Sequence, residues 1–279
     1  MIYLFGAIGA NLCMTFLMRY MEHHNGNRYA MNIWNYLAGF LFSIVLIPDK
    51  TLIVPKDIWG AGTVALGAVD GALFVIALIT IQKSIARNGP PLTTTFNRMG
   101  ILIPTVLSAL LFGEIPTAVQ ITGLCLAIFA IIYMNGGRKE EKPAFVLGLI
   151  LALLFGGTVD MIAKTYSRYF PAEMQSVFVM YTFFFAMLVS IGLFFKVKPK
   201  MTWLDVLIGI GVGIPNQLTT RFVLHACLEL PAYVVYPTYS AGLILAVNII
   251  NYLVFREKLS KRQYTAMAII GVALICINL

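Results

Sequence analysis

Several ionisable side chains lie inside stretches of sequence that are otherwise apolar. Asp70 stands between Gly67 and Gly71 in one such stretch, and Arg98 follows a run of threonines in the next. A charged side chain costs about 2.5–3.5 kcal/mol at the centre of a membrane helix, so it usually faces a polar cavity and has a partner. These positions predict a site for a polar solute or proton. The alternative for Asp70 is a structural cap or a pair with an arginine, and the alternative for Arg98 is that its side chain extends to the membrane interface.

A second group of polar residues follows one face of the stretch 204–227. Gln217, Arg221 and His225 are spaced by four residues, so a helix places them in one stripe. Three polar groups in a stripe argue against a lipid-facing position and favour either a cavity wall or a hydrogen-bonded seam between helices. Pro215, just before the stripe, predicts a kink or an interruption of this helix.

Asp160 and Lys164 are also four residues apart in an apolar stretch. An internal ion pair between them is one interpretation. The other is that Asp160 carries a proton, because burial raises the pKa of a carboxyl group.

The predicted site combines two carboxylates, two guanidiniums, several amides and aromatic side chains. Guanidiniums bind carboxylates or phosphates, and aromatic rings stack on cationic or aromatic groups, although Trp and Tyr also occur in membrane interfaces. This mixture favours a zwitterionic or neutral polar solute. The predicted substrate-binding residues are Trp34, Asn35, Asp70, Thr94, Asn97, Arg98, Asn216, Gln217, Arg221 and Tyr239, and the predicted proton carriers are Asp70, Asp160 and His225.

The composition identifies the kind of chain that must position these residues. Of 279 residues, 59 % are hydrophobic and only 11 % are charged, and the mean hydropathy is +0.85. Soluble domains carry roughly 25 % charged residues. The net charge of +8 fits basic membrane loops better than a nucleic-acid site. We predict an all-α polytopic membrane protein with ten transmembrane helices, at roughly 2–18, 30–48, 58–82, 92–112, 116–134, 144–165, 174–195, 204–227, 232–254 and 263–278.

The loop charges and a possible internal repeat indicate how these spans are arranged. Loops after odd-numbered spans hold fourteen Lys and Arg residues and loops after even-numbered spans hold four, which favours both termini outside. Five residues recur at an offset of 143 positions. We therefore predict two inverted five-helix repeats, 1–137 and 138–279, in one membrane domain. The recurring pairs are Phe112/Phe255, Glu114/Glu257, Gln120/Gln263, Thr122/Thr265 and Asn135/Asn278.

The run Leu111-Phe112-Gly113-Glu114, followed by Gln120 and Gly123, resembles the EamA-like branch of the drug/metabolite transporter (DMT) superfamily. Pro104 also fits that pattern, whereas Arg256 departs from it in the second half. The resemblance covers essentially the whole chain. It implies a ten-helix transporter or exporter of small metabolites with both termini in the cytoplasm, which conflicts with the loop charges.

These observations predict a secondary transporter that moves a small polar or zwitterionic, amino-acid-like metabolite across the cytoplasmic membrane by alternating access. A transporter of organic cations or drugs is the alternative, and a non-transporting scaffold or sensor is an alternative of another class. The sequence has no phosphate-binding P-loop and no recognisable catalytic or metal-binding motif, so we expect no enzyme activity, cofactor or metal. We also expect lipids and a small-molecule substrate as partners, no nucleic acid, and a monomer.

Overall fold

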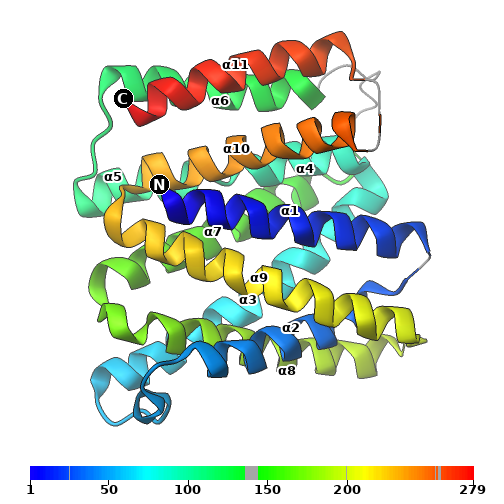
Figure 1. Ribbon diagram of the computed structural model, residues 1–279, viewed down its shortest axis with the longest axis vertical. Coiled ribbons are helices and arrows are strands. Elements are labelled where there is room, and N and C mark those ends of the chain that lie inside the picture. Colours follow the sequence, from blue (N-terminus) through cyan, green and yellow to red (C-terminus); the bar gives the residue numbers. More distant parts are fainter. Residues whose placement is uncertain (25, 136–143, 199, 255, 257–258) are drawn as a thin grey trace. The chain divides into compact units, whose positions relative to one another are not determined.

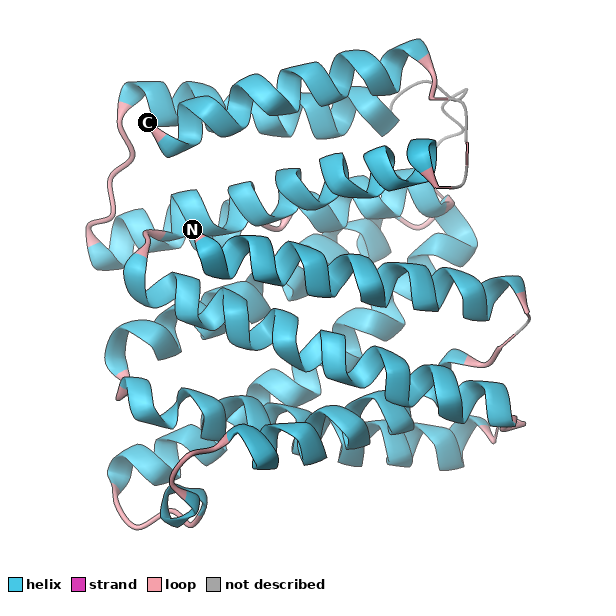
Figure 2. Ribbon diagram, viewed as in Figure 1, coloured by secondary structure: helices cyan, strands magenta, loops and turns pink. Residues whose placement is uncertain are grey.

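The structure is a computed structural model that describes residues 1–24, 26–135, 144–198, 200–254, 256 and 259–279. Throughout these residues the secondary structure is helical, and the helices follow one another through short connections (Figures 1 and 2). The elements are α1 (Ile2–His23), α2 (Arg28–Leu46), the 3-10 helix η1 (Lys50–Ile53), α3 (Ile58–Asn88), α4 (Pro90–Met99), α5 (Leu102–Phe112), α6 (Ala118–Asn135), α7 (Val146–Tyr169), the 3-10 helix η2 (Ala172–Met174), α8 (Gln175–Val197), α9 (Trp203–Glu229), α10 (Ala232–Leu253) and α11 (Lys261–Asn278).

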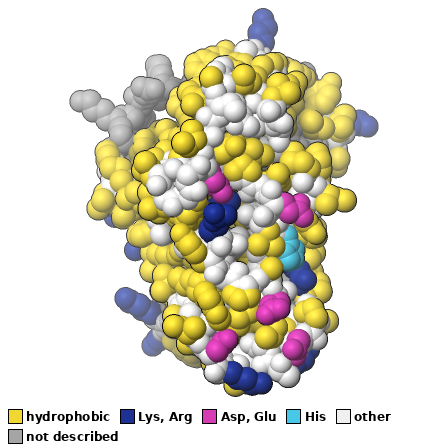
Figure 3. Space-filling view, turned by 90° about the vertical axis from the view of Figure 1, so that its left-hand side faces the viewer, with side chains coloured by type: hydrophobic (Ala, Val, Ile, Leu, Met, Phe, Trp, Pro, Cys, Tyr) yellow, Lys and Arg dark blue, Asp and Glu magenta, His cyan; other side chains and the backbone are white. Residues whose placement is uncertain are grey.

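Seven helical spans in the described part of the chain are long and apolar enough to cross a membrane. Large hydrophobic side chains are exposed on almost every helix, and they cover much of the face drawn in Figure 3. An exposed surface of this kind is stable in lipid, so the protein is a multi-pass membrane protein. The seven spans are Ile2–Met21, Arg28–Leu46, Ile58–Asn88, Leu92–Phe112, Val146–Tyr169, Ala172–Val197 and Ala232–Leu253.

The predicted span 92–112 is divided into two helices, which the sequence analysis did not anticipate. The break falls at Gly100, between α4 and α5. There the N–H of Gly100 donates to the carbonyl of Asn97 at 3.1 Å, and the N–H of Ile103 donates to the carbonyl of Gly100 at 3.0 Å. These tighter three-residue bonds replace the α-helical pattern for one turn. At Pro215, where a kink or an interruption was predicted, α9 continues without interruption.

The helices form two compact units. Unit 1 comprises Met1–Val75 and Thr165–Leu228, and unit 2 comprises Ile76–Lys164 and Glu229–Leu279. Each unit therefore draws on both predicted repeats. The predicted boundary between the repeats, at 137/138, lies outside the described residues.

In unit 2, α6 and α11 pack side by side along their length (Figure 1). Gly123 of α6 contacts Cys276, and Ala127 contacts Ala273 and Ile277, whereas Ile131 further along α6 packs on Ile270. The two helices are therefore antiparallel. Small residues at the contact allow the close approach that membrane helices favour.

The beginnings of α6 and α11 have matching hydrogen bonds. The Gln120 side chain accepts from the N–H of Thr117 at 2.9 Å, and the Gln263 side chain accepts from the N–H of Ser260 at 2.8 Å. Each hydroxyl in turn accepts from the glutamine N–H at 3.3 Å, so both helices begin with a capping box. The capping residues are 143 positions apart, the offset of the sequence matches. Phe255 and Glu257, which belong to the same set of matches, lie outside the described residues.

In unit 1, α2 packs against α8 in the antiparallel direction. Tyr36 contacts Phe183, whereas Ile47 at the other end of the contact packs on Val177 and Met180. Helix α9 lies along α2 in the parallel direction, and Gly209 and Gly213 of α9 meet the α2 backbone directly.

Asp205, in the first turn of α9, joins this helix to the start of α2. Its carboxylate accepts from the N–H of Asn27 at 2.6 Å and from the N–H and hydroxyl of Thr202 at 2.8 and 2.9 Å. Asp205 is fully buried. Asn27 is itself the N-cap of α2, so one carboxylate stabilises two helix beginnings.

Replacing Asp205 by alanine should lower the free energy of unfolding by about 2–3 kcal/mol, because three donors at two helix beginnings lose a buried, charged acceptor. Equilibrium unfolding in mixed detergent micelles measures this change. Asp57→Ala, which removes an exposed cap from Gly60, is the matched control and should cost about 1 kcal/mol. Equal losses in the two variants would contradict the role assigned to Asp205.

Candidate functional site

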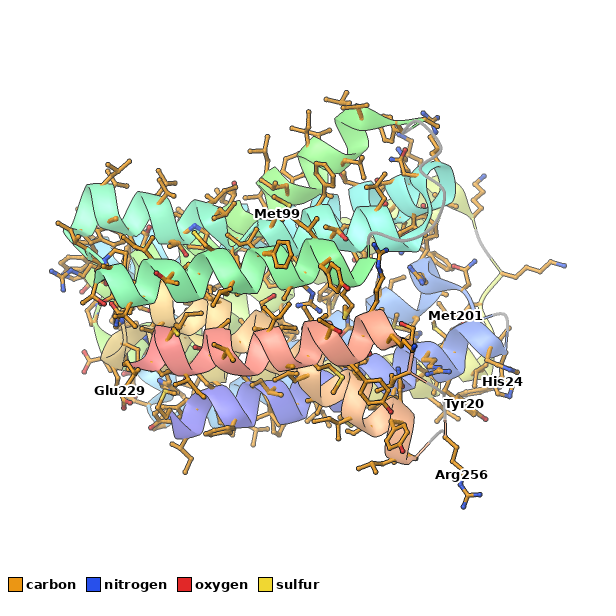
Figure 4. The ribbon with its side chains drawn as sticks, turned by 90° about the horizontal axis from the view of Figure 1, so that it is seen from above. Tyr20, His24, Met99, Met201, Glu229 and Arg256 are labelled. Atoms are coloured by element: carbon orange, nitrogen blue, oxygen red, sulfur yellow. The ribbon has the colours of Figure 1, made fainter. Side chains whose placement is uncertain are left out.

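The break between α4 and α5 lies against two glycines of α7 in unit 2. A Cβ atom on Gly157 would come 2.4 Å from the carbonyl oxygen of Gly100, and one on Gly156 would come 2.9 Å from Oδ1 of Asn97. Only glycine permits this approach of two backbones. Met99, where α4 ends, is labelled in Figure 4. The sequence Gly156-Gly157 therefore seats the broken helix on α7.

Charged side chains of opposite sign lie beside this break. Arg98 occupies the last turn of α4, and Asp160 lies one turn beyond Gly156 on α7. Both side chains are half-buried, and the positive charge of Arg98 acts on the Asp160 carboxylate. The backbone carbonyl of Asp160 accepts from the hydroxyl of Tyr236 on α10. The arrangement presents a guanidinium, a carboxylate and the Asn97 amide at one discontinuity of the backbone.

One sequence interpretation pairs Lys164 with Asp160, whereas the ion pair seen for Lys164 in the described part of the chain is with Glu114. Its ammonium group contacts the carboxylate of Glu114 at 2.6 Å, and the two side chains are 3 % and 17 % exposed. The charge that acts on the Asp160 carboxylate is that of Arg98. Glu114 follows α5 and Lys164 lies on α7, so their ion pair joins two parts of the chain that are far apart in sequence. The four-residue spacing of Asp160 and Lys164 could not reveal it.

Glu114 follows Gly113, whose left-handed conformation (φ +70°) ends α5. The Glu114 carboxylate accepts from the N–H of Ala232 at 2.7 Å, at the first residue of α10. Lys164 donates to the carbonyl of Leu230 at 3.2 Å. This ion pair therefore stabilises the connection before α10, where free backbone groups need partners.

Asp70 lies in unit 1, where the structure surrounds it with close packing. The hydroxyl of Thr182 on α8 donates to its Oδ2 atom at 3.1 Å, and Asp70 is 2 % exposed. A Cβ atom on Gly71 would come 2.4 Å from the carbonyl oxygen of Thr182, and one on Gly67 would come 2.7 Å from Cβ of Tyr181. Both glycines therefore let α3 pack closely on α8.

The polar stripe of α9 lies in the same unit and is only partly satisfied. Asn216 donates to the side-chain oxygen of Asn35 at 3.1 Å, and Arg221 donates to the carbonyl of Leu46 at 3.4 Å. Gln217 is fully buried, and neither its oxygen nor its nitrogen has a hydrogen-bond partner among the described residues.

The remaining predicted residues vary in their surroundings. The Trp34 ring nitrogen donates to the sulfur of Met201 at 3.5 Å, and the His225 ring lies 5.4 Å from that of Tyr3. Thr94 is exposed on α4, and Tyr239 is half-buried on α10. Unit 1 thus holds Trp34, Asn35, Asp70, Asn216, Gln217, Arg221 and His225, and unit 2 holds Thr94, Asn97, Arg98, Asp160 and Tyr239.

Sequence reasoning missed the helix break, the Tyr236 contact and the Glu114–Lys164 pair. The available signal was the combination of Gly100 with Gly156-Gly157, three small residues in facing spans. Within the described ranges, no cluster of three or more His, Cys, Asp or Glu side chains is arranged to hold a metal ion.

Comparisons with known proteins place the chain in a fold but not in a named family. No family model matches it. An uncharacterized protein of Haemophilus influenzae is 24 % identical over 252 residues, which cover 88 % of this chain and 86 % of that protein. A solved crystal structure is similar with a TM-score of 0.78 at 14 % identity, covering 99 % of this chain and 94 % of that one. The chain shares the fold of that structure, and its resemblance to the DMT superfamily stays a prediction.

Removing one partner of the Glu114–Lys164 pair should lower the free energy of unfolding by about 3–5 kcal/mol, since the other charge is left buried and unpaired. Glu114→Gln and Lys164→Met test each partner, and the double variant should lose less than the sum of the single variants. Unfolding measurements on all three complete a double-mutant cycle. Additive losses would contradict a direct interaction.

Proposed function

We propose that this protein is a secondary transporter that carries a small polar or zwitterionic metabolite across the cytoplasmic membrane, without covalent change to the solute. The observation that carries the proposal is the interrupted span α4–α5, with Asn97 and Arg98 at the break and Gly156, Gly157 and Asp160 facing it. All these residues belong to unit 2.

An interrupted helix supports transport because the hydrocarbon core offers no hydrogen bonds to backbone groups. Backbone groups that leave the helical pattern must find partners in protein or in a water-filled cavity. Many secondary transporters bind their substrate at such discontinuous helices, where backbone and side-chain groups converge near the middle of the membrane. A scaffold or a sensor has no comparable use for an arginine and a carboxylate on the helices that flank a break.

The packing of equivalent helices supports the ten-span, inverted-repeat part of the proposal. The predicted second and seventh spans are α2 and α8, and the fifth and tenth are α6 and α11. Within each unit, the equivalent helices pack antiparallel, as inversion of one repeat requires. The matching capping boxes add a second likeness. We therefore propose that α6, α9 and α11 also cross the membrane and that the two repeats exchange conformations in alternating access.

The charges favour a solute that carries both signs. Arg98 supplies a bidentate donor for a carboxylate, and Asp160 supplies an acceptor for an ammonium group. An organic cation would gain from Asp160 but would meet the repulsion of Arg98. The structure therefore favours a zwitterion over the cationic drugs that were the alternative.

Transport can be measured with purified protein in liposomes, using a panel of labelled amino acids and other small polar metabolites. Arg98→Ala and Asp160→Asn should each reduce the initial flux by about tenfold or more, because each removes a charge-assisted contact to the solute. Arg98→Lys should retain more flux than Arg98→Ala.

Arg87→Ala is the matched control. Arg87 is an exposed arginine of the same unit that lies over the Phe145 ring at 4.8 Å, away from the break. Its flux should stay at the wild-type level. Full flux in folded Arg98→Ala and Asp160→Asn proteins, or no flux for any solute in the wild type, would overturn the proposal.

A further inference from the structure

Gln217 is a buried amide for which the described structure provides no hydrogen-bond partner. Both its Oε1 and its Nε2 atoms are unpaired, and the side chain is fully buried in unit 1. Leaving a buried polar group unsatisfied is costly, and native proteins keep few such groups. An orphaned amide of this kind therefore points to a partner that is present in another state of the protein.

The position of Gln217 follows from its neighbours on α9. Gly213, one turn before it, meets the backbone of α2 at Asn35, and Arg221, one turn after it, donates to the carbonyl of Leu46. Residues four apart share a helix face, so Gln217 lies on the face of α9 that packs along α2.

Neighbouring polar groups on α2 and α9 are already engaged. Asn35 and Asn216 bond to each other, and the Ser43 hydroxyl donates to the carbonyl of Gly39 at 2.8 Å. These bonds join the neighbouring groups to one another or to the backbone, and no hydrogen bond among the described residues reaches the Gln217 amide.

The contact between α2 and α9 is close. Gly209 and Gly213 bring the two backbones together, and Met31 of α2 packs with Ile208 and Val212 of α9 in one buried cluster. Pro215, two residues before Gln217, removes one backbone hydrogen bond from α9. Separation of these helices would expose Gln217 and Arg221 on one face.

We propose that Gln217 recognises the head group of a zwitterionic amino acid once this contact opens. A carboxylate would accept from Nε2 of Gln217 and from the guanidinium of Arg221, and the adjacent ammonium group would donate to Oε1 of Gln217. One carboxamide thereby pairs with both charges of an α-amino acid. This inference rests on the proposed transport function and specifies the solute that unit 1 would accept.

The test measures thermal unfolding of the detergent-purified protein with and without each of the twenty standard L-amino acids. Without solute, Gln217→Met should raise the apparent Tm by about 2–6 °C, because the orphaned amide is replaced by an apolar side chain of similar length. With the amino acid that stabilises the wild type most, the variant should need about tenfold more solute or more for the same shift.

Two further variants separate recognition from stability. Ser190→Ala removes another buried polar group that has no partner among the described residues, on α8 of the same unit. It should keep the wild-type response to solute. Gln217→Asn retains the amide but shortens it by one methylene, so it should fold like the wild type and respond weakly. The stabilising amino acid should also act more strongly than its analogues that lack the amine or the carboxyl group.

A lower Tm for Gln217→Met, a wild-type response in either Gln217 variant, or no stabilisation by any amino acid would overturn this inference. Flux of a different solute in liposomes, with no response to amino acids, would overturn it while leaving the proposed function intact.

Discussion

Hydrocarbon offers no hydrogen bonds, so each backbone or side-chain polar group within the membrane must be satisfied by the protein itself or by a cavity that it encloses. This constraint explains the features around the break between α4 and α5. Three-residue hydrogen bonds keep the backbone bonded at the tighter turn, and the missing Cβ atoms of Gly100, Gly156 and Gly157 let α7 lie against it. Arg98 and Asp160 place charges of opposite sign on the two helices beside the break, and the charge of Arg98 acts on the Asp160 carboxylate. An uninterrupted helix would need none of these arrangements, which is why they bear on function.

The same constraint accounts for the polar residues that hold helices together. Asp205 satisfies donors at the beginnings of two helices, and the Glu114–Lys164 pair does so before α10. Asp70 and Thr182, and likewise Asn35 and Asn216, form pairs between helices. Gln217 differs from these residues, since both polar atoms of its buried side chain lack a hydrogen-bond partner among the described residues. A buried amide in that condition lowers the stability of the described conformation.

Much of the helical architecture was predictable from the sequence, because long apolar stretches with polar breaks leave few alternatives. The break at Gly100 was not predictable, since glycine is common in membrane helices and the hydropathy of the span is continuous. The sequence suggested Asp160 as a partner of Lys164, but the observed partner is Glu114. A four-residue spacing describes one helix and says nothing about a neighbouring one. The stripe of Gln217, Arg221 and His225 was predicted on one helix face, but Arg221 binds the carbonyl that ends α2. Distances between helices were the missing information.

The central claim is that the α4–α5 break faces a water-accessible path for the solute. Single cysteines at Asn97 and, as a lipid-facing comparison, at the exposed Val106 can be introduced after Cys13, Cys125, Cys227 and Cys276 are replaced. A membrane-impermeant thiol reagent should label the cysteine at 97 in proteoliposomes, and the transported solute should slow that labelling, while the cysteine at 106 stays unlabelled. Labelling at 97 as slow as at 106 would contradict the claim, and so would labelling that the solute leaves unchanged.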